Sequence, residues 1–344
     1  MPPQPDPAEP EWLCQARAGD SGAFERLVAP YRRSLHTHCY RMLGSPHDAD
    51  DALQETLLAA WRGVASFEGR SALGTWLYRI STNTCLRLIS QRPRRMESPD
   101  HGPAFHATAD LGQMVTGPVW LEPLPDDGGA PGHGDAHDDP ADALARRERV
   151  ALAFLAALQH LPGTQRAVLL LRDVLEYSAA EAADMLGTSV ASVNSALQRA
   201  QKTVKDKMPA VSQAAELQAL GESGLDKLLS AFVTAWESRN IEELVRLFTE
   251  DVRFTMPPLP AWFDGREFVE KFIVERVFAT PWRMLPLRAN GQVGLACYMK
   301  PEGADRFRLG GITLLSLRAG RIAGLHSFLD PAVHRRFGLT EEIS

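Results

Sequence analysis

Apolar residues recur at helical spacing through the first half of the chain. They predict a helical stretch from Glu11 to Leu43 and a further helix after Ser45-Pro46, with Ser45 as N-cap and Pro46 at the first helical position. Another helix is predicted from Ser71, and helix resumes from Ala141 to Gln159. The pattern therefore predicts an all-helical N-terminal part.

Two short helices that meet at a tight corner are predicted between Ala179 and Lys202. Gly187 supplies the turn, and Val190, Val193 and Leu197 recur as the buried stripe of the second helix. The other face offers hydrogen-bonding groups for base edges and cations for phosphates, as a major-groove recognition helix requires. An ordinary helical hairpin with a solvated face is the alternative, because helix-turn-helix patterns are degenerate. This polar face comprises Ala191, Ser192, Asn194, Ser195, Gln198, Arg199 and Lys202.

From Leu225 onward the pattern mixes helices and strands. Gly-containing turns separate the later strands, which predicts an antiparallel meander. The expected helices include Ile241–Phe248 and Phe268–Phe278, and the expected strands are Val252–Met256, Met284–Ala289, Val293–Lys300, Phe307–Leu317 and Arg321–Phe328.

Between the helical parts, Met96 to Ala141 is rich in Pro, Gly, Asp and His, and no Lys or Arg occurs between Arg95 and Arg146. Such a composition predicts an acidic linker that buries no core. Val119, Trp120 and Leu121 interrupt the acidity, which suggests an anchor. Because this segment is acidic, the net charge of −6 for the whole chain does not reveal the basic character of the sequence on either side of it.

The rest of the composition limits the protein class. At 344 residues and 44% hydrophobic content, two or three soluble domains are expected. The four scattered cysteines form no metal-binding pair, and His36 and His38 would point to different faces of a helix, so no metal or cofactor is expected. No leader or apolar run of membrane-spanning length occurs, so a cytoplasmic protein with no membrane contact is expected.

Two helix faces suggest partners. After Ser45, Asp50, Asp51, Gln54 and Glu55 surround an exposed Leu58, which suits docking onto a basic partner, although a solvated helix face is the alternative. Further on, cations alternate with aromatic residues, as binding of single-stranded nucleic acid requires, although Trp76 alone is more typical of a core. This second set comprises Thr75, Trp76, Tyr78, Arg79, Asn83 and Arg87.

Three segments in one order carry a family resemblance: HDADDALQETLLAAW, FEGRSALGTWLYRISTN and LPGTQRAVLLLRDVLEYSAAEAADMLGTSVASVNSALQRAQ. From about Cys14 to Val204 the chain resembles an extracytoplasmic-function sigma factor of the sigma-70 family. The resemblance implies that Asp48, Asp50, Asp51, Gln54, Glu55 and Leu58 bind core RNA polymerase. It implies that the −10 promoter element is recognised and melted by Arg70, Ser71, Thr75, Trp76, Arg79 and Asn83.

The same resemblance assigns the −35 element to the second helix of the pair. The implied residues are Ser189, Ser192, Asn194, Ser195, Gln198, Arg199 and Lys202. Many family members carry cations where this chain has Ala196 and Gln201, which predicts a weaker phosphate grip.

The third domain resembles SnoaL-like members of the NTF2-like superfamily, in which a curved antiparallel sheet wraps helices into a cone with a pocket. The segments that carry the resemblance are AFVTAWESRNIEELVRLFTEDVRFTMPP and GITLLSLRAGRIAGLHSFLD. Large aromatic residues either line a possible ligand pocket or form the core. They are Trp236, Phe254, Trp262, Phe263 and Trp282, and the candidate acids and bases are Asp251, Asp264, His326 and Asp330.

The sequence thus predicts a multidomain chain with two all-α sigma modules and an α+β SnoaL-like cone. The expected parts are a disordered 1–10, region 2 at 11–95, a linker at 96–140, region 4 at 141–207, a linker at 208–223 and the SnoaL-like domain at 224–344. We expect a non-enzymatic sigma factor that binds core polymerase and promoter DNA and is regulated in cis by its last domain. The alternatives are a one-component ligand-sensing regulator and a bifunctional protein with a catalytic last domain.

Overall fold

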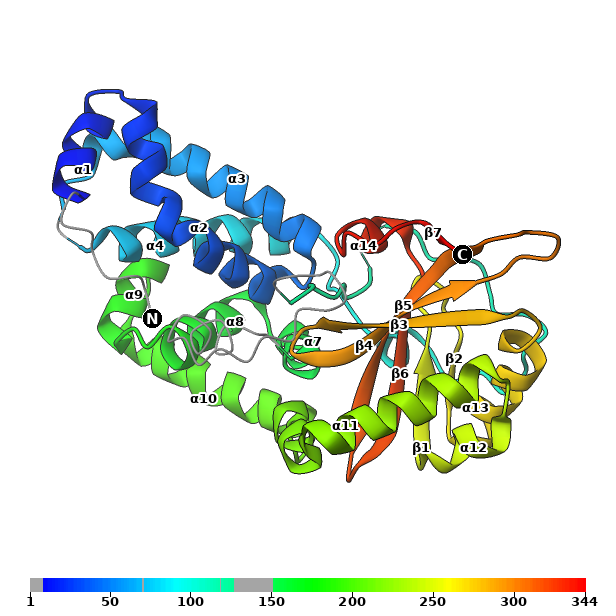
Figure 1. Cartoon of the computed structure of the whole chain (residues 1–344). Coiled ribbons are helices and arrows are strands. Elements are labelled where there is room, and N and C mark those ends of the chain that lie inside the picture. Colours follow the sequence, from blue (N-terminus) through cyan, green and yellow to red (C-terminus); the bar gives the residue numbers. More distant parts are fainter. Residues whose placement is uncertain (1–8, 70, 118, 127–150) are drawn as a thin grey trace. The chain divides into compact units, whose positions relative to one another are not determined.

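The computed structural model describes residues 9–69, 71–117, 119–126 and 151–344 (Figure 1). The chain divides into two compact units, one of Met1–Arg95 with Ala153–Met208 and the other of Met96–Leu152 with Pro209–Ser344. Residues 1–8 of the expected disordered N-terminus and residues 127–140 of the expected linker lie outside the described residues, whereas residues 9 and 10 belong to a helix.

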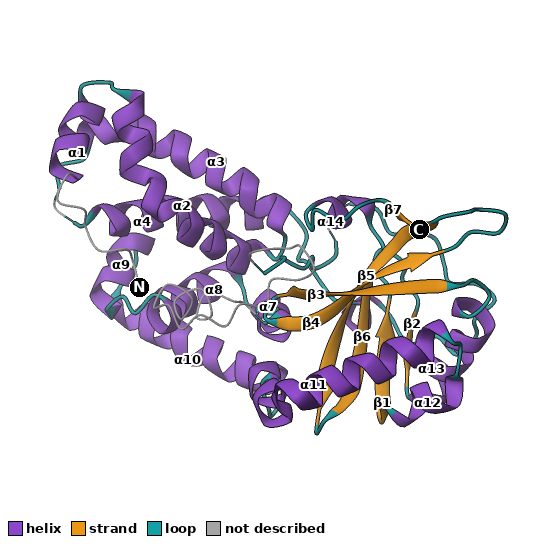
Figure 2. Cartoon of the chain, viewed as in Figure 1, coloured by secondary structure: helices purple, strands orange, loops and turns teal. Residues whose placement is uncertain are grey.

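The described residues of the first unit form helices joined by loops (Figure 2). Its N-terminal helices are α1 (Glu9–Arg17), α2 (Ser21–Leu43), α3 (Pro46–Gly63), the 3-10 turn η1 (Val64–Ser66) and α4 (Leu73–Gln91). They are followed by α7 (Leu152–Gln159), α8 (Gly163–Leu169), the π-helical turn η2 (Leu170–Val174), α9 (Ala179–Leu186) and α10 (Val190–Lys207).

Local sequence signals place these helix ends. Ser45 caps α3 by accepting the Asp48 N–H, at 3.2 Å, as its sequence predicts. Ser178 and Glu181 form a reciprocal capping box at the start of α9. Gly187 then ends α9 in the left-handed conformation, with φ of 61°, and so makes the predicted corner before α10.

One apolar core joins the two halves of this unit. Leu27 and Leu77 of the N-terminal helices belong to the same cluster as Val168, Met185 and Val193. Helices α2 and α4 therefore pack against the α8–α10 part.

The second unit is built on a seven-stranded sheet of order β2-β1-β6-β5-β4-β3, with β7 paired to β5. The strands are β1 (Phe248–Thr255), β2 (Trp262–Asp264), β3 (Trp282–Ala289), β4 (Gln292–Met299), β5 (Phe307–Arg318), β6 (Arg321–Phe328) and β7 (Glu342–Ile343). The helices are α5 (Ser98–His101), α11 (Gln213–Glu237), α12 (Ile241–Arg246), α13 (Arg266–Phe272), the π-helical turn η3 (Ile273–Val277) and α14 (Pro331–Arg335).

The predicted meander is confirmed for β3 to β6, which pair antiparallel in chain order. The expectation of a wholly antiparallel sheet is wrong, because β1 lies parallel to β6. Alternation along a strand shows which residues share a face, but it does not identify the neighbouring strand.

The expectation that the linker buries no core is wrong for residues 96–126. Trp120 and Leu121 are buried, and Phe105 and Leu111 pack against the core of the second unit. Backbone hydrogen bonds fix the segment: Phe105 N–H donates to Trp262 O at 2.7 Å, and Asn290 N–H donates to Leu124 O at 3.0 Å. We call this stretch, residues 96–126, the docked segment.

The segment at 208–223, which the sequence predicts as a linker or a connecting helix, contains the start of helix α11. Gln213 of α11 exchanges hydrogen bonds with the backbone of Leu317, at 2.7 and 2.9 Å. The Glu216 carboxylate accepts the Ala319 N–H at 2.8 Å. These contacts attach the start of α11 to the sheet, ahead of a kink at Gly221.

Candidate functional site

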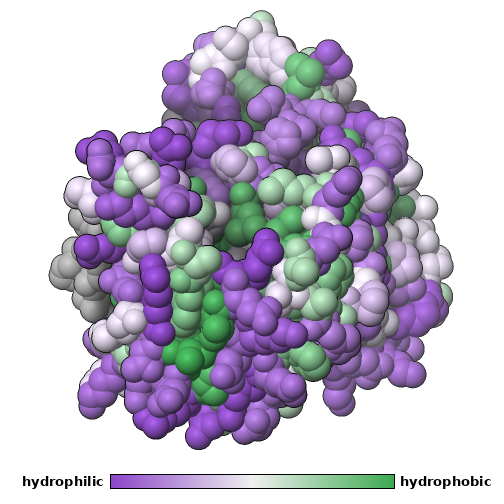
Figure 3. Space-filling view, turned by 90° about the vertical axis from the view of Figure 1, so that its right-hand side faces the viewer, coloured by the Kyte–Doolittle hydropathy of each residue, from purple (hydrophilic) through white to green (hydrophobic). Residues whose placement is uncertain are grey.

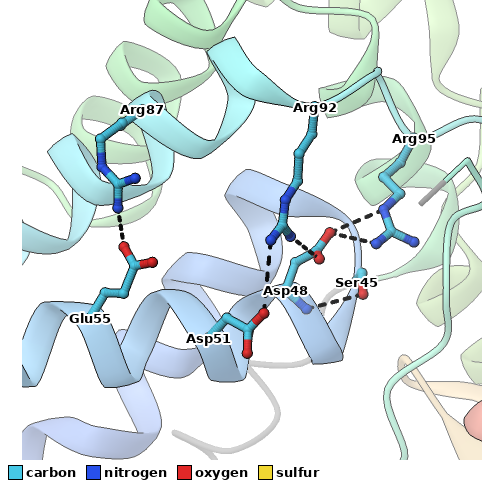
Figure 4. A network of polar contacts seen from close by, with 7 residues as sticks. All are labelled: Ser45, Asp48, Asp51, Glu55, Arg87, Arg92 and Arg95. Carbon is cyan, nitrogen blue, oxygen red and sulfur yellow. Dashed lines mark hydrogen bonds and ion pairs between the residues drawn. The ribbon is translucent and has the colours of Figure 1, made fainter. Parts of the chain in front are cut away.

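The acidic face of α3 is not equally exposed along its length (Figure 4). Asp48 is buried, and its carboxylate accepts hydrogen bonds from Arg95, at 2.5 Å for Nη2, and from Arg92. Arg95 is itself 5% exposed. Asp48 therefore belongs to a buried ion-pair cluster, and its carboxylate is not part of the accessible acidic face of α3.

The remaining members of the face are accessible. Asp51 forms an ion pair with Arg92, at the end of the neighbouring helix α4, as Figure 4 shows. Glu55 forms an ion pair with Arg87 of the same helix. Asp50 accepts from His36 at 2.9 Å. Gln54 is exposed, and Leu58 is 49% exposed. The accessible part of α3 thus combines carboxylates with one apolar side chain.

The residues predicted for the −10 element lie at the start and along one side of α4, apart from Arg70, which is outside the described residues. Ser71, Arg79 and Asn83 are exposed, whereas Thr75 and Trp76 are partly buried. The Trp76 ring packs on Phe67 with 4.8 Å between ring centroids. Trp76 is therefore held in a fixed position with part of its ring accessible.

Region 4 approaches this side of α4. Arg79 Nη1 lies 3.6 Å from an Asp184 carboxylate oxygen of α9, and the rings of Tyr78 and Tyr177 meet edge to face at 6.2 Å. The exposed Arg79 pair contributes little to stability, since surface ion pairs are worth about 0–1 kcal/mol. A residue predicted to bind DNA is thus engaged within the chain.

The face predicted for the −35 element is exposed on α10. The exposed set includes Ser189, Ser192, Asn194, Ser195, Gln198, Arg199 and Lys202. On the opposite side, Val193, Ala196 and Ala200 are buried against the rest of the unit. The helix therefore presents one continuous polar face.

One prediction for α10 is wrong, and another refers partly to a buried position. Val190 is 44% exposed rather than buried, because it is the first residue of the helix and precedes the buried stripe. Ala196 is 6% exposed, so its position belongs to the core and says nothing about phosphate contacts. Gln201 is exposed and donates to Asp173 at 2.8 Å.

A buried arginine that the sequence analysis missed joins α8 to α2. Arg166 is 3% exposed, and its guanidinium donates to the carbonyl oxygens of Met42 and Leu161 and to Gln159. Burial lowers its pKa to about 10. The sequence feature that could have identified it is a single cation among the apolar residues of α8.

The aromatic residues proposed for a pocket in the third domain form its core. Trp236, Phe254 and Phe263 are buried in one cluster, and Phe263 stacks on Phe272 at 4.5 Å. Trp262 is buried and donates to Gly102 O of the docked segment at 2.8 Å, while Trp282 packs against the same cluster. These contacts support the core alternative for the five side chains.

The candidate acids and bases of this domain have structural partners. Asp251 pairs with Arg318, which lowers the pKa of the carboxyl group, and Asp264 accepts from Arg253 at 3.1 Å. His326 lies between Thr255 and Ser316, at 3.2 and 2.9 Å, and burial lowers its pKa to about 4. Asp330 caps α14 by accepting the Ala332 N–H. The four do not form a single catalytic group.

Among the described residues, no cluster of three or more His, Cys, Asp or Glu side chains could hold a metal ion. His38 is buried beside Thr82, at 3.0 Å, and its burial lowers the pKa to about 3. It is therefore a neutral core residue. Within the described parts of the chain, no helix is both long and apolar enough to span a membrane.

A few large apolar side chains remain accessible. The face of the molecule drawn in Figure 3 is mostly hydrophilic, with hydrophobic residues gathered in a hollow and in a strip. The exposed large apolar residues of the described chain include Leu58, Met114, Val190, Val211 and Val274. Leu58 lies on α3 one turn after Gln54 and Glu55.

Three family models match the chain in succession. They are Sigma-70 region 2 at residues 27–95, Sigma-70 region 4 at residues 151–204 and the SnoaL-like domain at residues 229–325. The two sigma models fall on the helices that carry the candidate surfaces, and the third falls on α11 to β6.

Similar proteins agree with these models. The chain is 41% identical over 329 residues to the ECF RNA polymerase sigma factor SigG of Mycobacterium tuberculosis, covering 94% of this chain and 85% of the relative. It is 34% identical over 193 residues to SigM of the same organism, covering 56% of this chain and 81% of the relative. The crystal structure of M. tuberculosis SigJ has a similar fold, with a TM-score of 0.56 and 19% identity over 90% of this chain and 98% of SigJ. The chain belongs to the extracytoplasmic-function sigma factors of the sigma-70 family, with a SnoaL-like domain at its C-terminal end.

Proposed function

We propose that this sigma factor binds core RNA polymerase through α3, captures the opened −10 strand with α4 and reads the −35 duplex with α10. The polar face of α10 carries the proposal, since its neutral donors and acceptors flank Arg199 and Lys202 along one exposed side. Such a mixture suits base edges and phosphates in a major groove. The SnoaL-like domain regulates this activity in cis and performs no reaction of its own.

The polymerase contact is proposed for the accessible part of α3. Leu58 stands beside Gln54 and Glu55, so a basic partner with an apolar notch would bury it. Asp51 and Glu55 already pair with arginines of this chain, so a partner must exchange those exposed contacts for its own. Such exposed pairs are weak, about 0–1 kcal/mol, and their exchange costs little.

The packing of region 4 on region 2 supports a closed form, which regulation of the activity would have to open. Promoter elements at −10 and −35 are about 25 base pairs apart, or about 85 Å at 3.4 Å per base pair. In this structure, however, α9 reaches α4 closely enough for the Arg79–Asp184 contact at 3.6 Å. The two helix surfaces must separate before both elements can be bound. The structure thus corresponds to a closed form.

Run-off transcription with purified core polymerase tests the proposal. The full-length chain should direct transcripts from a subset of a promoter library. Leu58→Asp should abolish core binding in gel filtration, whereas Val274→Asp, at a site of similar exposure, should retain it. Arg199→Ala should keep core binding but lose −35-dependent transcription, whereas Arg246→Ala on α12 should keep both.

The same experiment separates the alternatives. A one-component regulator would bind an operator without polymerase and would be indifferent to Leu58→Asp. Absence of transcripts across the library would contradict the sigma-factor proposal.

A further inference from the structure

We propose that the second unit contains a binding site for a small organic cation, an amine that carries an aromatic or branched apolar group. The site is a cavity of about 300 Å³ between the docked segment and the end of β6. It is separate from the aromatic core inside the cone. Its apolar walls come from Met114, Val115, Trp120, Pro258, Phe328 and Val333.

Hydrogen bonds hold both walls of the cavity in place. Val115 N–H donates to Pro258 O at 2.9 Å, and the Trp120 indole N–H donates to Val115 O at 3.1 Å. The Trp120 ring, 6% exposed, also packs on His101 with 5.0 Å between ring centroids. A site formed in this way needs little further ordering when a ligand binds.

The charges around the cavity select the ligand. Among the lining residues described by the structure, the charged side chains are Glu122 and Asp330, both acidic. The cap hydrogen bond from Ala332 N–H, at 2.8 Å, fixes the Asp330 carboxylate. Carboxylates beside aromatic rings attract a cation and repel an anion. Binding sites for small molecules are commonly about 300–1,000 Å³, so this cavity suits a compact ligand.

The location of the cavity links the ligand to the regulation proposed above, on which this consequence rests. The docked segment supplies one wall and lies in the chain between regions 2 and 4. A ligand that binds only when both walls are present stabilises the docked state by mass action. The ligand would therefore bias the position of the chain between the two DNA-binding modules.

Binding of three matched probes to the full-length chain tests the site. The probes are 2-phenylethylamine, the neutral 2-phenylethanol and the anionic phenylacetate, titrated at pH 7.5 by calorimetry and Trp fluorescence. For a ligand of this size we expect a dissociation constant for the amine of about 1 mM, with roughly tenfold weaker binding of the alcohol and none of the acid. Glu122→Gln with Asp330→Asn should remove the preference, and Asn preserves the α14 cap.

A charge-matched control is Glu302→Gln with Asp305→Asn, two exposed acids outside the cavity, which should bind as the native chain does. Thr116→Phe places a ring at an exposed lining position and should weaken amine binding without loss of fold. The site is contradicted by no amine binding up to about 10 mM, by equal binding of the three probes, or by full binding to the Thr116→Phe protein. Selective binding that leaves transcription unchanged would support the site and contradict the proposed regulation instead.

Discussion

Asp48 shows how one residue can share a helix with a docking face and still have a different role. Its carboxylate is buried with Arg95, whereas Asp51, three residues later, is partly exposed beside Arg92. Asp48→Ala would leave buried arginine charge without its partner, so we expect a loss of about 3–5 kcal/mol in the free energy of unfolding. Asp51→Ala should cost about 0–1 kcal/mol. Urea unfolding of both proteins measures the difference, and equal losses would contradict the structural role of Asp48.

The environment of Glu97 in the docked segment predicts that attachment of this segment depends on pH. Glu97 lines a small cavity together with Thr255 and His326, and burial of its carboxyl group, with Asp100 nearby, raises the pKa to about 7 despite the opposing charge of Arg253. Because the folded-state pKa is above the ordinary value of 4.5, this group's stabilising contribution is complete below pH 4.5. That contribution then falls as the pH rises to 7.

Amide exchange can measure this effect. The Phe105 N–H donates to Trp262 O of β2 at 2.7 Å and so reports attachment of the segment. Between pH 5.5 and 7.5, its protection factor should fall in the native chain relative to Glu97→Gln, by up to about tenfold per pH unit. The lowered pKa of His326 affects both proteins alike, so it cancels in the comparison. Identical pH dependence in the two proteins would refute the role of Glu97.

At the scale of elements, the sequence predicted the structure best where neighbouring residues in the chain determine it. Ser45, Gly187 and the alternation in β3 to β6 correctly predicted a cap, a corner and a meander. The sequence analysis failed where residues far apart in the chain determine the structure, as for the parallel pairing of β1 with β6 and the burial of Ala196. Ala196 was considered only through the family resemblance, as a position where many members carry a cation, and helical periodicity alone marks large apolar residues rather than a small one as the buried stripe.

The corner between α9 and α10 has a conformational requirement that can be measured. Gly187 has φ of 61°, and a Cβ added there would meet nothing within 4 Å, so substitution brings backbone strain alone. Gly187→Ala should therefore cost about 1 kcal/mol in the free energy of unfolding. Gly102→Ala, at an extended position with equally open space, should be nearly neutral. A smaller melting-temperature shift for Gly187→Ala than for Gly102→Ala would contradict this account.

For the whole molecule, the docked segment was hidden from sequence analysis by its composition. Phe105, Leu111 and Trp120 are spaced without period among Pro, Gly and Asp, so no helix or strand pattern marks them. Phe105 and Leu111 pack on a core assembled from residues far along the chain, and Gly102 of the same segment accepts a hydrogen bond from Trp262. The candidate surfaces were better predicted, because α3, α4 and α10 carry their polar faces in the local helical pattern. The role of each surface residue stays a prediction.

The contact between regions 2 and 4 gives the last prediction. A Cβ on Gly163 would lie 3.2 Å from Leu86 Cδ2 and 3.3 Å from Ile89 Cγ2, so α8 packs closely on α4 at this glycine. Gly163→Leu should act as a wedge, because its side chain needs space that these two residues occupy. We expect weaker attachment of region 4 to region 2 and a larger distance between labels on α4 and α10.

If the closed form limits promoter binding, the wedge should raise run-off transcription several-fold at limiting sigma concentration, since released helices can reach two elements about 85 Å apart. Gly102→Leu, outside this contact, should leave transcription unchanged. Gly163→Leu places no new charge on the α3, α4 or α10 surfaces, so a rise cannot come from tighter DNA contacts. Label separation without increased transcription would show that the closed form does not restrain the promoter-binding helices.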